Sequence, residues 1–534
     1  VSCNTLDTDG AGKLVCGTDE TGSGGGVATT SPFTAGYIPF ATSSSAITNS
    51  NIFQSGSNVG VGTTTPNNLL QVYDLLSFNN TDFNTQSGYQ AGKNIVAGAQ
   101  YNAFYGYQAG YSTTTGSDAD YNTAVGYQSL YSNTTGDSST AIGYRSLYKN
   151  TTGYQNTANG SYSLYSNTTG YQNIANGYGS LYSNTTGYYN SAIGLYSLYS
   201  NTTGYRNSAV GVSSLYSNTT GYYNSAVGYQ SLRSNTTGFS NSAVGYQSLY
   251  SNSTGFRNSA IGLESLFSNT TGDSNSAIGY QSLYSNTSGY GHTANGYRSL
   301  YSNKTGSGNA VLGAEAGYGV SGGNVASSTL LGYRAGYALA TSSANILLGY
   351  QAGDNLSTGS NNIVLGFDID APSATSANTL NIGNLLFGTS IDGAGTTLST
   401  GNIGIGTTTP ASLLDVAGTV QFRGFSTSTT GLYVDGSGNV GIGTTTPNNL
   451  LQVYDLLSFN NTDFNTQSGY QAGKNIVAGA QYNAFYGYQA GYSTTTGSAA
   501  DYNTAVGYQS LYSNTTGYSN SAIGYQSLYS NTTG

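Results

Sequence analysis

The sequence predicts an all-β protein, a β-solenoid or parallel β-roll made of stacked 17-residue coils. Glycine supplies 77 of the 534 residues and tyrosine 51, while only 6% of residues are charged. Disordered chains are usually highly charged and poor in aromatic and β-branched residues, so this composition favours ordered β structure. A unit of fixed length also repeats along the chain, and its apolar residues lack the spacing of a helix.

The repeat unit has the consensus N-S-A-[VI]-G-Y-Q-S-L-Y-S-N-T-T-G-Y-x. Its first glycine returns at the same interval in eleven units, at Gly126, Gly143, Gly160, Gly177, Gly194, Gly211, Gly228, Gly245, Gly262, Gly279 and Gly296. A short β-prone piece followed by the turn piece S-N-T-T-G predicts one coil per unit, stacked at about 4.8 Å. We expect buried apolar side chains such as Ile193 and Leu198 in each coil.

A single coil cannot be stable alone. Ordering 17 residues of backbone costs roughly 17–34 kcal/mol, whereas each buried apolar side chain returns roughly 1.5–3 kcal/mol. Neighbouring coils must therefore stabilise one another. We also expect a partner chain, most simply a second and third copy in a homotrimer.

Short connector modules with the motif G-[VI]-G-T-T-T-P separate the repeats. The segment from Asn58 to Gly136 returns almost unchanged as Asn439 to Gly517, an offset of 381 residues, which indicates that the chain lengthened by duplication. Five segments follow: a leader at 1–57, a connector at 58–87, a β-roll array at 88–388, tandem connectors at 389–468 and the start of a second array at 469–534.

Stacked coils turn each position of the unit into a column of side chains. One aromatic column contains Tyr131, Tyr148, Tyr165, Tyr182, Tyr199, Tyr216, Tyr250, Tyr284 and Tyr301. We expect it to be a packed seam between chains, and the alternative is a surface on which sugar rings stack.

A second column consists of asparagines in N-x-[ST] sequences, the acceptor pattern for N-glycosylation. Its members are Asn133, Asn150, Asn167, Asn184, Asn201, Asn218, Asn235, Asn252, Asn269, Asn286 and Asn303. We expect these asparagines to build exposed corners through bonds to the backbone. Exposed corners would also leave them free to carry glycans.

The sequence predicts no catalytic, cofactor or metal site. Glu264 and Asp273 are the best candidates for a catalytic pair of carboxylates, but we expect them to be unrelated surface residues. His292, in place of a consensus asparagine, is expected to be a substituted corner residue without a nearby partner. Cys3 and Cys16 are candidates for a disulfide loop. The acidic stretch Asp7–Gly10 only weakly matches a calcium loop, so a solvated loop is expected there.

The repeats resemble the head repeats of YadA-type trimeric autotransporter adhesins, on residues such as Asn190-Ser191-Ala192-Ile193-Gly194 with Ser197 after them. The connector modules resemble those of phage tail-fibre-like and bacterial surface-fibre proteins. The resemblance implies a homotrimeric attachment fibre with a left-handed parallel β-roll. The 17-residue unit of this chain is longer than the adhesin repeat, so its coil must be larger or carry a longer corner.

We therefore expect a structural and adhesive fibre, extracellular at a cell surface or part of a virion tail, and not an enzyme. Its expected partners are its own copies and a surface receptor or glycan. With 12 Lys and Arg in the chain, no nucleic-acid partner is expected, and no apolar run is long enough to span a membrane. The alternatives are a glycan-binding module that uses the tyrosine column and, third, a polysaccharide-cleaving tailspike.

Overall fold

A computed structural model describes residues 52–113 and 119–533, except residues 56, 67–69, 73–74, 80–81, 424–429, 448–449, 454–455, 461–462, 478 and 494–499. Of the strands within residues 5–51, and of residues 78–79, 421–423, 430 and 458–460, it describes only the backbone. The chain divides into two compact units, Val1–Ala377 and Asn378–Gly534.

The first unit begins with a mixed sheet. Strand β1 pairs antiparallel with β2, and β5 pairs antiparallel with β4 and β6. From β6 the connector continues through β7 and β8 to β9, where the repeat array begins. The bounds are β1 Thr5–Thr8, β2 Leu14–Gly17, β3 Val27–Thr29, β4 Tyr37–Ser43, β5 Ala46–Ser55, β6 Asn58–Val61, β7 Leu70–Val72, β8 Leu76–Asn79 and β9 Asn84–Ser87.

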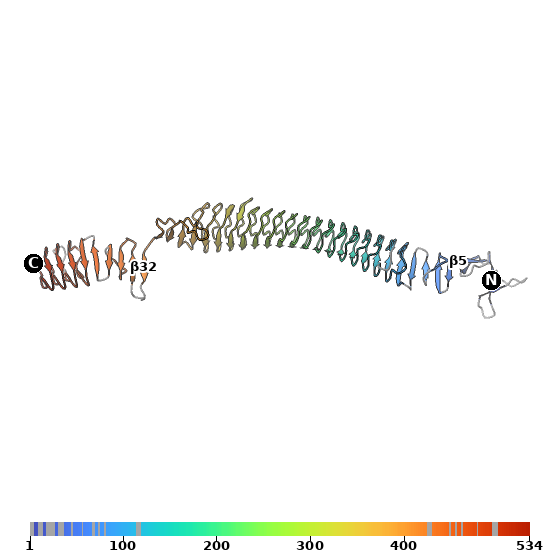
Figure 1. Cartoon of the computed structure of the whole chain (residues 1–534), viewed down its shortest axis with the longest axis horizontal. Coiled ribbons are helices and arrows are strands. Elements are labelled where there is room, and N and C mark those ends of the chain that lie inside the picture. Colours follow the sequence, from blue (N-terminus) through green and yellow to red (C-terminus); the bar gives the residue numbers. More distant parts are fainter. Residues whose placement is uncertain are drawn as a thin grey trace. The chain divides into compact units, whose positions relative to one another are not determined.

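Seventeen parallel strands then form one uninterrupted ladder, to which each coil contributes one strand. Figure 1 shows the successive coils along the chain. Each strand pairs with its equivalent one coil later, so that Ala192 lies opposite Ala209. The prediction of a β-solenoid with 17-residue coils is confirmed. After β9 the ladder contains β10 Ala103–Tyr105, β11 Thr123–Val125, β12 Thr140–Ile142, β13 Thr157–Asn159, β14 Ile174–Asn176, β15 Ser191–Ile193, β16 Ser208–Val210, β17 Ser225–Val227, β18 Ser242–Val244, β19 Ser259–Ile261, β20 Ser276–Ile278, β21 Thr293–Asn295, β22 Ala310–Leu312, β24 Thr329–Leu331, β26 Ile346–Leu348 and β27 Ile363–Leu365.

Backbone hydrogen bonds between coils also extend around the turns, outside the strands. In the coil Asn190–Arg206, the N–H of Leu198 donates to the carbonyl of Ser214 at 3.0 Å, and that of Gly194 donates to Asn176 at 2.8 Å. The corner does the same, with Thr202 donating to Thr219 at 3.0 Å. Each coil therefore satisfies its polar backbone mainly through its neighbours, which is why the array is the folding unit.

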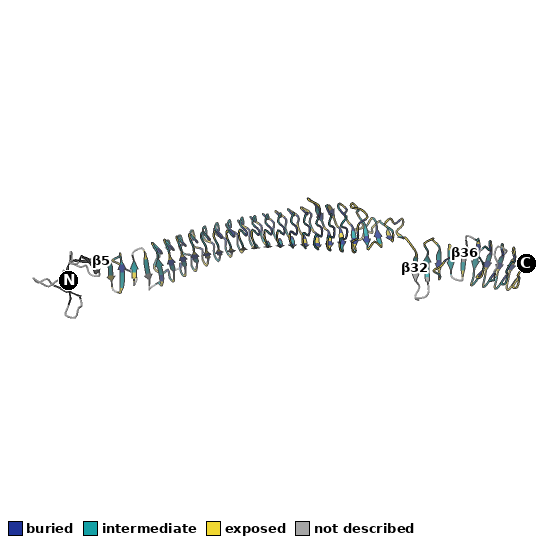
Figure 2. Ribbon diagram, turned by 180° about the vertical axis from the view of Figure 1, so that it is seen from behind, coloured by how far each residue is buried: buried dark blue, intermediate teal, exposed yellow. Residues whose placement is uncertain are grey.

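The core of each coil is thin and largely polar. In the coil of Asn190 the buried apolar side chains are Ala192 and Leu198, and beside them lie buried Ser197 and Asn201. Figure 2 shows the buried and exposed positions recurring along the coils. Two apolar side chains cannot offset the ordering of a coil, so coil-to-coil hydrogen bonds and stacking are essential.

The prediction that Ile193 is buried is wrong. Successive side chains of a strand point to opposite faces, and strand β15 points only its central residue, Ala192, into the core. Ile193 is 42% exposed, whereas the prediction for Leu198, which has no exposed surface, is confirmed.

Coils outside the eleven units of strict consensus fill the same space with a different pair of core residues. Phe104 stands where strict coils have alanine, and Gly110 stands where they have leucine. A Cβ added at Gly110 would approach the Phe104 ring to 2.6 Å. The coil with Leu347 and Gly353 shows the same exchange, with a 2.9 Å approach. A large side chain at one position therefore requires a small one at the other, which conserves the core volume.

The glycine that follows each strand is required by backbone geometry. Gly211 has φ +131°, and a Cβ there would approach the carbonyl oxygen of Gly228 in the next coil to 2.4 Å. In the coil of Asn190, non-glycine residues also lie in the left-handed region, among them Tyr196 at +55° and Leu198 at +50°. These dihedrals bend the chain back into a closed coil.

Near the end of the first unit, β23 Asn324–Ala326 and β25 Thr341–Ser343 form a separate parallel pair. The second unit repeats the connector-to-ladder sequence, with parallel pairing resuming from β37 through β40. Its strands are β28 Leu380–Ile382, β29 Leu386–Gly388, β30 Ile403–Ile405, β31 Leu414–Val416, β32 Val420–Arg423, β33 Thr430–Val434, β34 Val440–Ile442, β35 Leu451–Val453, β36 Leu457–Asn460, β37 Asn465–Ser468, β38 Ala484–Tyr486, β39 Thr504–Val506 and β40 Ser521–Ile523. Across the described ranges, no helix has the length and apolarity needed to cross a membrane.

Candidate functional site: side-chain columns on the coils

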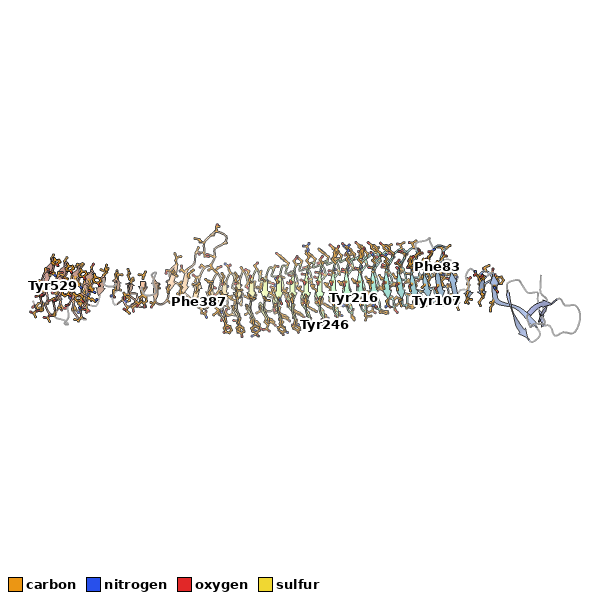
Figure 3. The ribbon with its side chains drawn as sticks, turned by 90° about the horizontal axis from the view of Figure 1, so that it is seen from below. Phe83, Tyr107, Tyr216, Tyr246, Phe387 and Tyr529 are labelled. Atoms are coloured by element: carbon orange, nitrogen blue, oxygen red, sulfur yellow. The ribbon has the colours of Figure 1, made fainter. Side chains whose placement is uncertain are left out.

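The predicted tyrosine column is a continuous stack. Adjacent rings lie 5.0–5.3 Å apart between centroids and are within 13° of parallel. Figure 3 labels Tyr216, a member of this column, among the side chains drawn along the ribbon. The stack contains Tyr111, Tyr131, Tyr148, Tyr165, Tyr182, Tyr199, Tyr216, Arg233, Tyr250, Phe267, Tyr284, Tyr301, Tyr318 and Tyr337.

Arg233 continues the stack where a ring is missing. Its guanidinium carbon lies 5.3 Å from the ring centroid of Tyr216 and 5.8 Å from that of Tyr250. Within the column, burial and the neighbouring phenols Tyr182 and Tyr216 raise the pKa of Tyr199. The Tyr199 phenol is therefore neutral at physiological pH.

The stacking determines what this column can bind. A sugar stacks on the face of an aromatic ring, but both faces of Tyr199 are covered by Tyr182 and Tyr216 at 5.0 and 5.1 Å. The column presents ring edges and hydroxyl groups to its surroundings instead. The geometry therefore gives no support to sugar stacking along the column.

A second aromatic column lies along the coils, and it was not predicted from the sequence. The tyrosine that follows S-N-T-T-G in the consensus is the signal that could have revealed it. The rings of this column lie 4.9–5.0 Å apart. The members are Tyr154, Tyr171, Tyr188, Tyr205, Tyr222, Phe239 and Phe256.

The asparagines of the N-x-[ST] sequences are buried, which corrects the expectation that these corners are exposed. From Asn133 to Asn286 they have no exposed surface, and Asn303 has 2%. Asn201 Nδ2 donates to Asn184 Oδ1 at 2.8 Å and to the Gly204 carbonyl at 3.0 Å. The interpretation that they build the corner is confirmed. The atom that would carry a glycan is enclosed and already donates two hydrogen bonds.

A second buried asparagine ladder runs beside the first. Asn190 Nδ2 donates to Asn173 Oδ1 at 3.1 Å and to the Gly204 carbonyl at 2.8 Å. This ladder and the first therefore share the Gly204 carbonyl as an acceptor. This second ladder was not predicted from the sequence, although the asparagine at the first position of the consensus could have indicated it.

His292 occupies this second ladder, so the expectation of a corner residue without a partner is wrong. It is 1% exposed, and its Nε2 lies 2.6 Å from the Gly306 carbonyl. Its Nδ1 faces the backbone N–H of Asn309 at 3.3 Å. Nδ1 therefore accepts, Nε2 donates, and the ring is neutral.

Burial lowers the pKa of His292 to about 4, an effect only partly offset by the hydrogen bond to Gly306. The ring also interrupts the first ladder. Asn303 Nδ2 lies 3.2 Å from His292 Nε2. Within the described residues, Asn286 Oδ1, which would otherwise accept from Asn303, has no hydrogen-bond partner.

The candidate carboxylates have separate partners. Glu264 Oε2 accepts from Gln281 Nε2 at 2.7 Å, and Asp273 Oδ2 accepts from Ser274 Oγ at 3.0 Å. Among the described residues, no group of three or more His, Cys, Asp or Glu is arranged to hold a metal ion. Cys3 and Asp7–Gly10 lie outside the residues whose side chains are described, as does the side chain of Cys16.

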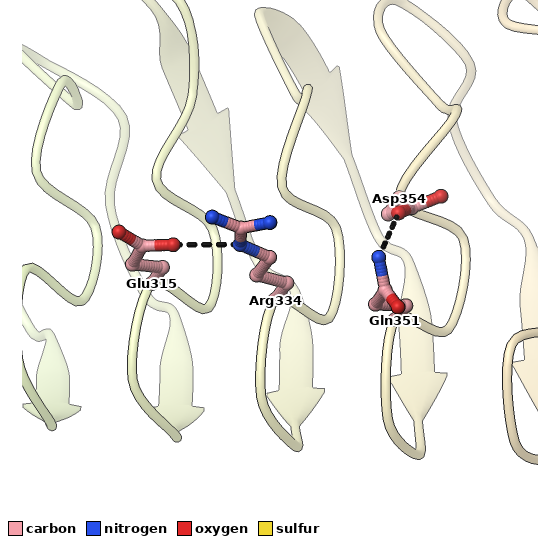
Figure 4. Close-up of polar contacts among 4 residues, drawn as sticks. All are labelled: Glu315, Arg334, Gln351 and Asp354. Atoms are coloured by element: carbon pink, nitrogen blue, oxygen red, sulfur yellow. Dashed lines mark hydrogen bonds and ion pairs between the residues drawn. The ribbon is translucent and has the colours of Figure 1, made fainter.

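Polar contacts on the surface occur both between coils and within a coil. Arg334 Nε forms an ion pair with Glu315 Oε2 of the preceding coil at 2.7 Å, whereas Gln351 Nε2 donates to Asp354 Oδ2 of its own coil at 3.2 Å (Figure 4). A cavity of about 180 Å³ lies between the first connector and the first coil, and Gln71, Leu76, Gln86 and Lys93 are among its lining residues. Only the lysine of the lining residues is titratable, so the cavity lacks an acid–base pair.

An exposed apolar stripe runs along the ladder of the first unit. We define it as the last residue of each strand from β11 to β27 in the ladder, together with the residue two positions later. Ile193 and Leu195 are 42% and 43% exposed, and Val244 and Tyr246 are 39% and 46% exposed. The stripe contains no charged residue: its first column is Val125, Ile142, Asn159, Asn176, Ile193, Val210, Val227, Val244, Ile261, Ile278, Asn295, Leu312, Leu331, Leu348 and Leu365, and its second is Tyr127, Tyr144, Ser161, Tyr178, Leu195, Val212, Tyr229, Tyr246, Leu263, Tyr280, Tyr297, Ala314, Tyr333, Tyr350 and Phe367.

Comparison with family models, curated proteins and solved structures finds no match to this chain.

Proposed function

We propose that this chain is a structural and adhesive fibre, extracellular at a cell surface or part of a virion tail, which spans distance and presents a repetitive surface. The observation that carries the proposal is the exposed apolar stripe along an uninterrupted ladder. Seventeen strands at a spacing of about 4.8 Å extend over roughly 77 Å. Resistance to bending and reach are properties of such an array as a whole, and they require no local site.

The stripe supports self-association. Fourteen steps of about 4.8 Å make it roughly 67 Å long. Two side chains in each coil, one at the end of the strand and one two positions later, make it about 10 Å wide, so it covers roughly 700 Å². The largest apolar patch on a monomeric protein is typically about 300–600 Å², and stable interfaces bury about 800 Å² on each partner. A homotrimer with three stripes around a common axis, as the resemblance to trimeric adhesins implies, would cover this surface.

The two other functions have less support. Glycan binding by the tyrosine column would need free ring faces, and those faces are covered by neighbouring rings. Polysaccharide cleavage would need two carboxylates that share a groove, whereas Glu264 and Asp273 pair with other side chains.

Light scattering after size exclusion tests the proposal on the full chain. The wild type should have the mass of three copies, and the variant Val227→Lys with Val244→Lys should have the mass of one, because charges in the stripe lose their hydration on association. The matched control, Thr220→Lys with Thr237→Lys, alters exposed threonines outside the stripe and should keep the wild-type mass. A monomeric wild type would overturn the proposal.

A further inference from the structure

Asparagine interrupts the apolar stripe at three places. In its first column, twelve of the fifteen coils have Val, Ile or Leu, and the other three have Asn159, Asn176 and Asn295. All three asparagines are exposed at the ends of their strands. Their side chains point away from the core, so packing within the chain does not account for them.

A stripe of near-identical coils poses a problem of alignment between copies. If one copy slides by a single coil, fourteen of the fifteen layers still face another layer of the stripe. Hydrophobic burial is non-directional and depends on area. It therefore hardly distinguishes an aligned pair from one displaced by a coil, or a parallel pair from an antiparallel one.

We propose that Asn159, Asn176 and Asn295 set the axial alignment and the relative direction of neighbouring copies of this chain. The proposal rests on the self-association put forward above. In a parallel, unstaggered arrangement each asparagine faces the same asparagine of another copy, and the amides can donate to one another. Buried amides that lose such partners are costly, and a polar asparagine in an apolar seam fixes the register of coiled coils for the same reason.

Displacement by one coil breaks most of these pairs. Asn159 of one copy still faces Asn176 of the other. Four other layers, however, place an asparagine against an aliphatic side chain. The mismatched pairs are Ile142 with Asn159, Asn176 with Ile193, Ile278 with Asn295, and Asn295 with Leu312.

The spacing of the three asparagines also excludes a matched antiparallel arrangement. Asn159 and Asn176 are one coil apart, and Asn295 follows seven coils after Asn176, so the pattern is not its own mirror image. When Asn159 faces Asn295 in reversed copies, Asn176 faces Ile278. When Asn176 faces Asn295 instead, Asn159 faces Leu312.

The stripe fits a second copy of this chain for two reasons. Neither of its columns contains a charged residue, and the guanidinium groups of Arg145, Arg298 and Arg334 lie beside the second column, each 5.2 Å from one of its rings. The first column, which holds the asparagines, therefore brings no charged residue of its own to the same column of another copy. Its area of roughly 700 Å² is close to the 800 Å² that a stable interface buries on each side. A partner that matches it along fifteen coils must have the same axial repeat, and this chain has that repeat.

The test uses full-length chains with two different affinity tags, co-expressed in pairs. The variant Asn159→Ile with Ile193→Asn moves one asparagine by two coils and leaves the composition unchanged. It should assemble with itself as the wild type does. Its recovery in mixed assemblies with the wild type should fall at least about tenfold, because two layers are mismatched and sliding by one coil mismatches Asn295. The matched control, Ile193→Val with Val210→Ile, moves no asparagine and should mix freely.

Three outcomes overturn the inference or its basis, and they are distinguishable. Free mixing of the asparagine-shifted variant with the wild type, when each self-assembles, contradicts the alignment role and leaves self-association intact. Failure of the shifted variant to assemble with itself also contradicts the role, because its asparagines would still face one another. A monomeric wild type contradicts the proposed function itself.

Discussion

The buried histidine of the second asparagine ladder makes stability dependent on pH in one part of the array. His292 has its pKa lowered from 6.5 to about 4, so the folded state favours the neutral ring. A histidine whose pKa is lowered in the folded state contributes its full stability above pH 6.5, and it loses that contribution as the pH falls from 6.5 to 4. The loss is about 2 kcal/mol at pH 5 and about 3 kcal/mol below pH 4, at about 1.4 kcal/mol for each pKa unit.

The surroundings of His292 explain why protonation of its ring is unfavourable. A proton on Nδ1 would face the backbone N–H of Asn309, which now donates to that nitrogen at 3.3 Å. In a repeat array this loss of stability affects mainly the coils next to His292. Amide hydrogen exchange, corrected for the intrinsic effect of pH, should therefore show protection around His292 about 20-fold lower at pH 5 than at pH 7.

His292→Asn is the matched variant, because it restores the consensus residue. It should abolish this pH dependence in the coils between Asn275 and Asn309. It should also increase protection at pH 7, since Asn303 can then donate to Asn286 Oδ1, which lacks a partner in the described structure. Equal loss of protection in the wild type and the variant at pH 5 would refute the assignment of the effect to His292.

Three further predictions concern stability measured by urea unfolding. Asn218→Ala removes two donated hydrogen bonds and the acceptor of Asn235, so it should lower the free energy of unfolding by roughly 3–5 kcal/mol. The control Thr220→Ala, at an exposed position, should lower it only slightly, and equal losses would contradict the buried ladder. Ala226→Leu should lower the free energy of unfolding by roughly 1–3 kcal/mol through overpacking. Adding Leu232→Gly should restore most of that loss, because Phe104 with Gly110 shows the same combination of a large and a small core residue. Additive losses would contradict the exchange of volume. Gly211→Ala should cost roughly 1–3 kcal/mol because of its φ of +131° and the carbonyl of Gly228, and a neutral effect would argue against the coil spacing.

The repeat period made most of the fold predictable. Regular spacing of Gly194 and its equivalents gives one coil for each repeat unit, and stacking of coils then places Tyr199 under Tyr216. These predictions needed only the length of the unit and the spacing of parallel strands.

What the sequence could not show was which way each side chain points. A three-residue strand has one inward position, so hydrophobicity alone assigns either Ala192 or Ile193 to the core. Asparagine followed by threonine is equally suited to an exposed corner and to a buried ladder. His292 could not be placed without the ladder, because its partners come from residues 11 to 17 positions further along the chain.

High-resolution electron microscopy of the full chain in solution tests the central claim most directly. The account predicts parallel copies with coils at about 4.8 Å along each axis and with the stripe around Ile193 and Val244 buried between them. Single copies whose stripe remains exposed to solvent would contradict it.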